Sequence, residues 1–210
     1  MNARMIKNLS TVAALAFNIS ALADHNEPTL TVIGEPVVRG TGCPMDSSLV
    51  ELNGEEALAK ITFSNMQASL YGQKSLDRKF CGIVLNVAVP AGYQIKVPSV
   101  RLNGALDVSS AASGHLRNEI FFAGAGGSDI QELPIVGPIN TLYDLELDSA
   151  ASQTWSECGQ EVALRMNLSV LLRSAGMMRR YGSHGSSASV DSLLIAPTDA
   201  ATPVEMRRCE

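Results

Sequence analysis

Aromatic and basic residues are both scarce in this 210-residue chain. Phe, Trp and Tyr together make up 5% of it, and its 16 Lys and Arg are outnumbered by 21 Asp and Glu. Nucleic-acid-binding proteins need positive charge to neutralise phosphates, and single-strand binders also need aromatic side chains on which bases stack. We therefore expect no nucleic-acid partner. Hydrophobic residues make up 46% of the chain, which is typical of an ordinary globular domain and not of a disordered or collagen-like chain.

Long apolar segments are also missing, apart from one near the N-terminus. Arg4 and Lys7 precede an apolar stretch over residues 9–22, and a small-residue site ends at Ala23. This order is typical of a secretory signal peptide, and the stretch is too short and too interrupted to favour a membrane anchor. We expect residues 1–23 to be removed, leaving 14 Lys and Arg against 21 acids, a net charge of −7. The mature protein is expected to be secreted or periplasmic and not membrane-spanning.

Cysteine is limited to four residues, all in the expected mature chain: Cys43, Cys81, Cys158 and Cys209. An even number in an exported chain indicates disulfides, because the compartment is oxidising. The chain contains no Cys-x-x-Cys pair, which disfavours a zinc site, and we expect no bound metal. Spacing alone does not choose among the three possible connectivities. We predict that Cys81 pairs with Cys158, since each adjoins a strong predicted strand, and that Cys43 pairs with Cys209, since they lie toward the two ends.

Alternation of apolar and polar residues is the strongest structural signal. Residues 161–173 alternate in this way and predict a central strand with Leu164, Met166 and Leu168 facing the core. Residues 81–89 repeat the pattern and end at Pro90-Ala91-Gly92, a turn leading into residues 93–97. Weaker strand patterns occur at residues 29–33, 48–52, 58–63, 100–108, 118–122, 141–147 and 189–195.

Many short strands without alternating strand–helix units predict an all-β fold, an antiparallel β-sandwich of the jelly-roll or immunoglobulin-like kind with two disulfides. Residues 53–60 contain good helix formers but span barely two turns, so helices are expected only as minor decoration. The absence of repeats favours one domain over residues 24–210, long enough to fold as a monomer. Three loops, at residues 109–114, 124–129 and 182–187, are expected at the ends of the sandwich, where ligands are often met.

Four short motifs resemble a known protein family in their order and spacing. They are Gly40-Thr41-Gly42-Cys43-Pro44, Arg78-Lys79-Phe80-Cys81, Pro90-Ala91-Gly92-Tyr93-Gln94 and Trp155-Ser156-Glu157-Cys158-Gly159, with Val190-Asp191-Ser192 further along. Over nearly all of its mature part the chain resembles the domain-of-unknown-function 4360 family, small secreted proteins of bacteria and fungi. The resemblance implies a secreted, cysteine-bearing, all-β domain and brings no reaction, ligand or catalytic residue.

Catalytic and cofactor motifs of recognisable spacing are missing from the sequence. It contains no Gly-x-Ser-x-Gly, His-Glu-x-x-His, P-loop, dinucleotide fingerprint or EF-hand loop, and we expect no cofactor. Among the carboxylates, Asp144, Glu146 and Asp148 share one face of a predicted strand. We interpret this row as a solvated outer face, with a Ca²⁺ site or the paired carboxylates of a glycosidase as the alternatives.

One segment has the composition of a binding surface. Met177-Met178-Arg179-Arg180-Tyr181 combines flexible apolar, guanidinium and aromatic groups, followed by Gly182-Ser183-His184. A solvated strand end is the plainer interpretation, and we likewise interpret His184 as a solvated loop residue unless it contacts a ligand. We predict no catalytic residue and assign ligand contact to a set of five residues: Met178, Arg179, Arg180, Tyr181 and His184.

These patterns together favour a secreted, non-enzymatic binding or surface-interaction module whose partner is a protein or glycan. The alternative is a secreted carboxylate-dependent hydrolase acting on glycans, because sandwich folds host such sites and the fold does not decide the function. A structural protein of the envelope or wall is a third interpretation.

Overall fold

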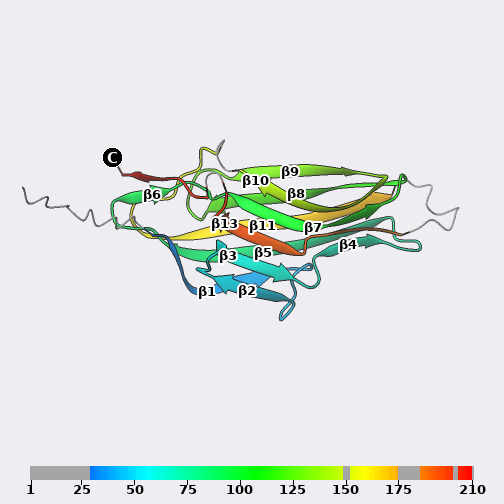
Figure 1. The fold of residues 1–210 in the computed structure, drawn as a ribbon, viewed down its shortest axis with the longest axis horizontal. Helices are drawn as coiled ribbons and strands as arrows, with labels where there is room; N and C mark the ends of the chain where they lie inside the picture. Colours follow the sequence, from blue (N-terminus) through cyan, green and yellow to red (C-terminus); the bar gives the residue numbers. More distant parts are fainter. Residues whose placement is uncertain (1–28, 149–151, 175–184, 201–202, 210) are drawn as a thin grey trace, which may run out of the picture.

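The structure is a computed structural model that describes residues 29–148, 152–174, 185–200 and 203–209. Within these residues the chain forms strands and no helix (Figure 1). The strands are β1 (Thr31–Arg39), β2 (Ser48–Leu52), β3 (Ala57–Phe63), β4 (Gln67–Leu70), β5 (Leu76–Ala88), β6 (Tyr93–Ile95), β7 (Val100–Val108), β8 (Ala112–Phe122), β9 (Asp129–Val136), β10 (Ile139–Leu147), β11 (Glu161–Ser174), β12 (Ser186–Ser189), β13 (Ser192–Pro197) and β14 (Met206–Arg208). The predicted all-β sandwich is confirmed.

Two antiparallel sheets form the sandwich. The five-stranded sheet has the order β1-β5-β11-β8-β9. In the second sheet β7 pairs along its whole length with β10, while its other edge pairs first with β13 and then with β12. From there β13 leads to β3 and β2, and β12 leads to β4. Figure 1 shows β1 and β2 together at one long edge, β9 and β10 together at the opposite edge, and the small β6–β14 sheet at the end that carries the C-terminus.

The core lies between the two sheets and is built from alternate residues of their strands. On β11, Leu164, Met166 and Leu168 have exposed fractions of 2%, 1% and 0%. They join one apolar cluster with inward residues of the opposite sheet such as Ile61 of β3 and Leu102 of β7. Because β11 pairs with β5 on one edge and β8 on the other, it is the middle strand of its sheet. The predicted central position and inward face of this strand are confirmed.

The short helix weighed for residues 53–60 is not formed. Residues from Ala57 onward belong to β3, and Ala57, Ala59 and Ile61 are buried while Leu58 and Lys60 are only partly covered. Burial of every second residue suits a strand, whereas a helix would place these side chains on several faces. Packing against the opposite sheet therefore overrides the helix propensity of Glu, Ala, Leu and Lys.

The predicted disulfide pairing is wrong, although all four cysteines are bonded. Cys43 is linked to Cys81 and Cys158 to Cys209, with Cα–Cα distances of 5.5 and 6.0 Å. In the first bridge, the connection from β1 to β2 lies against β5, where the backbone N–H of Gly42 donates to the Phe80 carbonyl at 2.9 Å. A Cβ on Gly40 would collide with that same carbonyl, so a glycine is needed for this approach. Contact between this loop and β5, which spacing does not reveal, decides the pairing.

The second bridge depends on the C-terminal tail. Cys158 precedes β11 in sequence, but in space Cys158 lies beside β6 and β14 and not beside Cys81. The N–H of Cys209 donates to the Gly92 carbonyl at 2.9 Å, and that of Gly159 donates to the Tyr93 carbonyl at 2.7 Å. Both half-cystines are thus held beside the turn that follows β5.

The last predicted strand, residues 189–195, is two strands in the structure. Val190 and Asp191 separate β12 from β13, and their N–H groups donate to the carbonyls of Met66 and Asn103 at 2.9 and 2.8 Å. Two of the predicted loops are also shorter than expected, since β8 begins at Ala112 and β12 at Ser186. Serine and glycine made these segments look like loops, yet their backbone groups complete the sheets.

Candidate functional site

The residues predicted to bind a ligand, Met178, Arg179, Arg180, Tyr181 and His184, lie outside the described residues. Their segment connects β11, which ends at Ser174, to β12, which begins at Ser186. Their role in binding stays a prediction.

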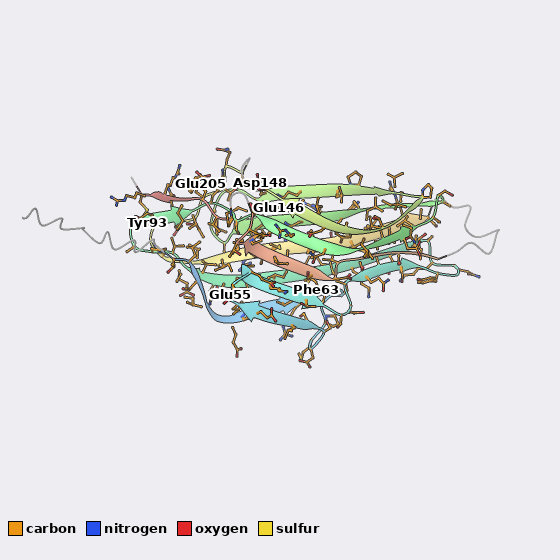
Figure 2. The ribbon with its side chains drawn as sticks, viewed as in Figure 1. Glu55, Phe63, Tyr93, Glu146, Asp148 and Glu205 are labelled. Atoms are coloured by element: carbon orange, nitrogen blue, oxygen red, sulfur yellow. A yellow bond between two sulfur atoms is a disulfide. The ribbon has the colours of Figure 1, made fainter. Side chains whose placement is uncertain are left out.

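The carboxylate row lies on β10 and just beyond it, on the outer face of the second sheet. Asp144 and Glu146 are exposed and stand opposite Asn103 and Arg101 of β7. The Arg101 guanidinium donates to Glu146 at 2.8 Å and to both carboxylate oxygens of Asp199 at 2.9 and 2.8 Å. Figure 2 shows Glu146 and Asp148 close to each other, and the Asp148 carboxylate, just beyond β10, accepts a hydrogen bond from the hydroxyl of buried Ser99 at 3.4 Å. The exposed position of Asp144 and Glu146 on β10 supports the interpretation of the row as a solvated outer face.

Arg101 organises the charges of this surface. The hydrogen bonds that Arg101 donates to Asp199 hold the pKa of that carboxyl below its usual value, and those that it donates to Asp199 and Glu146 raise the pKa of Arg101. A glycosidase needs two carboxyl groups that face each other across a bound sugar. Asp144 and Glu146 instead lie side by side on β10, and both are close to the guanidinium group of Arg101.

Two hollows of the surface have distinct chemistry, and neither is lined by Asp144, Glu146 or Asp148. The first, of about 420 Å³, lies at the β2–β3 turn and is lined by Glu51, Glu55, Glu56 and Lys60, of which Lys60 and Glu56 form an ion pair of 2.8 Å. The second, of about 580 Å³, is largely apolar and lies between the start of β1 and the tail residues near Met206. Among the described residues no group of three or more His, Cys, Asp or Glu side chains is placed to hold a metal ion.

The outer face of the five-stranded sheet carries a different set of side chains. We call its central part the β5–β11–β8 face. Alternation of inward and outward positions and the strand register assign to it these residues: Arg78, Phe80, Gly82 and Val84 of β5; Arg165, Asn167, Ser169, Leu171 and Arg173 of β11; Ser113, His115, Arg117, Glu119 and Phe121 of β8. Apart from Ser169, which is 4% exposed, all of them are partly or fully exposed to solvent.

Polar contacts order the middle of this face. The Glu119 carboxylate accepts a hydrogen bond from the Asn167 amide at 3.4 Å and lies 3.7 Å from the Arg117 guanidinium. His115 lies 3.8 Å from Glu132 of the edge strand β9. The Phe80 ring lies over Gly82, 3.5 Å from where a Cβ of that residue would be. The centre of the face therefore presents hydrogen-bonding groups beside a phenyl ring, with small residues between them.

A second aromatic group lies at the C-terminal end. The Arg207 guanidinium lies 3.9 Å from the centre of the Trp155 ring, and that of Arg208 lies 5.9 Å from the centre of the Tyr93 ring. Lys96, only 6% exposed, donates to Glu205 at 3.1 Å, and Figure 2 shows Tyr93 and Glu205 at this end of the molecule. These contacts attach the tail to the sandwich and cover one face of the only tryptophan in the chain.

Sequence reasoning missed the β5–β11–β8 face because, for residues 161–173, it used only the apolar half of the alternating pattern. The polar half of residues 161–173 contains Arg165, Asn167, Ser169 and Arg173, which the same period of two places together on the outside. The signal for the face was present, but the neighbouring strands were not known.

A model of the family described as a domain of unknown function (DUF4360) matches residues 31–209. The chain belongs to this family. In this DUF4360 protein the motifs that carry the resemblance surround the two disulfides, with Gly42 and Cys43 packed on β5 and Trp155 and Cys158 beside the tail. Their positions account for structure more readily than for a reaction.

A curated relative of the DUF4360 protein comes from Arthroderma benhamiae and is named an uncharacterized secreted protein. It is 27% identical over 136 residues, which cover 63% of this chain and 56% of the relative, so the match spans little more than half of that protein. Two disulfides are typical of proteins from oxidising, extracellular-type compartments, and together with the secreted relative they support secretion of this chain. The described part of the chain has no helix with the length and apolarity needed to cross a membrane.

Solved structures with some likeness to the DUF4360 protein include carbohydrate-binding modules. TmCBM61 in complex with β-1,4-galactotriose is 13% identical, with 84% of this chain and 90% of that chain covered and a TM-score of 0.32. The family 11 module from Clostridium thermocellum in complex with a mixed-linked tetrasaccharide is 5% identical, with coverages of 82% and 91% and a TM-score of 0.23. TM-scores this low carry no argument about function.

Proposed function

We propose that this protein is a secreted, non-enzymatic glycan-binding module and that the β5–β11–β8 face is its contact surface. The observation that carries the proposal is the placement of Phe80 beside the linked polar groups of Asn167, Glu119 and Arg117. Sugars present hydroxyl groups around apolar C–H patches, so their recognition needs fixed donors and acceptors next to an aromatic surface.

Rigid support favours this face as a contact surface. Its three strands form the middle of the five-stranded sheet, with Leu164, Met166 and Leu168 buried directly behind it. A preorganised surface loses less conformational entropy on binding than one carried on loops. The segment that carries Arg179, Arg180 and Tyr181 is proposed as a second contact.

The test measures glycan binding by the disulfide-intact protein on a glycan array, followed by calorimetry with the best ligand. Phe80→Ala and Asn167→Ala are each expected to weaken binding by about 1 kcal/mol or more, roughly fivefold, with melting temperature nearly unchanged. Thr62→Ala is the matched control, because Thr62 is an exposed strand residue on the outer face of the opposite sheet.

Two results would contradict the proposal. One is the absence of any retained glycan; the other is equal loss of binding in the Phe80, Asn167 and Thr62 variants. The double variant Arg180→Ala with Tyr181→Ala tests the second contact separately, and unaltered affinity would remove that segment from the site. Turnover of a glycan that is lost on changing Asp144 or Glu146 would favour the hydrolase instead.

A further inference from the structure

Charge is divided unequally between the two outer faces of the sandwich. At its paired positions the five-stranded sheet points five arginines and three glutamates outward: Arg39, Arg78, Arg117, Arg165 and Arg173, with Glu119, Glu132 and Glu161; exposed Glu35 lies in the irregular part of β1, outside these positions. The corresponding positions of the second sheet carry two cations and four acids: Lys60 and Arg101, with Glu51, Asp107, Asp144 and Glu146. A chain with a net charge of −5 thus has one outer sheet face with excess positive charge.

Several of these arginines have no acidic partner in the described part of the chain. No described carboxylate lies within 4.0 Å of the guanidinium groups of Arg39, Arg78 or Arg165. Arg101 on the opposite face differs, since two carboxylates lie 2.8 Å from it. An unpaired guanidinium offers a planar fork of donors that fits a carboxylate or sulfate group.

The strand register spreads the arginines along the face. Arg165 stands between Val84 and Phe121, and Arg39 stands opposite Gly82. Their cross-strand neighbours are therefore apolar or small residues and not other cations, which would repel them. Arg165 and Arg173 are eight residues apart on β11, about 27 Å at the usual rise of a strand. A small anion meets one of these groups at a time, whereas a polymer with repeated charges meets several.

Resting on the proposed function, we infer that the glycan is a polyanion, a polysaccharide whose residues carry carboxylate or sulfate groups. Its charges pair with Arg39, Arg165 and their neighbours while its sugar rings lie against Phe80 and Phe121. Nucleic acid is disfavoured by the acidic chain as a whole, because long-range repulsion opposes a long, densely charged duplex.

The experiment compares acidic polymers with neutral counterparts of the same backbone. Polygalacturonate is paired with its fully methyl-esterified form, and dextran sulfate with dextran; the first pair reports on carboxylate and the second on sulfate. We expect at least one acidic polymer to bind tenfold or more tightly than its neutral partner, with affinity that falls as salt rises from 50 to 300 mM. Arg39→Gln with Arg165→Gln is expected to lower that affinity about tenfold.

The control variant changes the same net charge on the opposite face. Lys60→Gln with Arg101→Gln also removes two positive charges and is expected to leave affinity within about twofold, because these side chains lie on the far side of the sandwich. Equal loss in both double variants would overturn the inference, since net charge alone would then explain binding. Melting curves of both variants check that each is folded.

Other outcomes separate this inference from the proposed function. If neutral and acidic polymers bind equally, independently of salt, and Phe80→Ala weakens that binding, the inference that the ligand is a polyanion is overturned. The proposal of a glycan-binding module then still holds. Binding of anionic vesicles or duplex DNA without binding of any polysaccharide overturns both.

Discussion

The disulfide between Cys43 and Cys81 holds the crossing from β1 to β2 against β5, so its removal should destabilise the whole sandwich. Both cysteines are fully buried, and the bridge closes a loop with a sequence separation of 38 residues. In the chain-entropy model a loop of this length contributes about 4 kcal/mol at 25 °C. Substitution of both cysteines by alanine also leaves space in the core, which adds to the loss. We therefore expect the free energy of unfolding to fall by about 4 kcal/mol or more.

The assay is urea denaturation of Cys43→Ala with Cys81→Ala and of the wild type, both without reductant and followed by far-UV circular dichroism. For a domain of this size the corresponding melting temperature should fall by roughly 8 to 16 °C. The pair Cys158→Ala with Cys209→Ala is the comparison, because Cys209 belongs to a tail that pairs with β6 only through the short strand β14. That variant is expected to release the tail and to cost less in global unfolding.

A loss below about 1 kcal/mol in the Cys43–Cys81 variant would refute this reasoning. It would mean that Gly42 and its hydrogen bond to Phe80 hold the loop on β5 without the covalent link. A changed slope of free energy against urea would instead show that the denatured state has altered.

Two further predictions concern the core and the response to acid. Leu164→Ala should cost about 2 to 5 kcal/mol in urea unfolding because Leu164 is 2% exposed, and a change below about 0.5 kcal/mol would contradict the inward register of β11. Burial alone would raise the pKa of Asp77, but hydrogen bonds from Lys74 and the Ser69 N–H outweigh it and hold that pKa below the usual value. The stabilisation that the Asp77 carboxylate provides is therefore fully present above about pH 4, the pKa of Asp in the unfolded chain, and is lost as pH falls through its lower pKa in the folded protein. Asp77→Asn should flatten that part of the curve of unfolding free energy against pH, and an unchanged curve would exclude Asp77 as its source.

Several parts of the candidate site were within reach of sequence reasoning. The period of two in residues 161–173 identifies both the buried side chains of β11 and, on its other side, Arg165 and Asn167. It does not identify Phe80 or Glu119 as their neighbours, since that depends on the register of β5 and β8 against β11. Cross-strand pairs between residues far apart in sequence leave no local pattern.

The sequence by itself determined the all-β class, the buried face of the middle strand and the participation of all four cysteines in disulfides. These follow from local alternation and from an even cysteine count in a chain with a secretory pattern. Only the tertiary structure decided which cysteines meet, that residues 189–195 are divided between β12 and β13, and that one outer face gathers five arginines. The physical reason is the same in each case: strand order and sheet packing bring together residues separated by tens of positions, and no short-range pattern encodes that order.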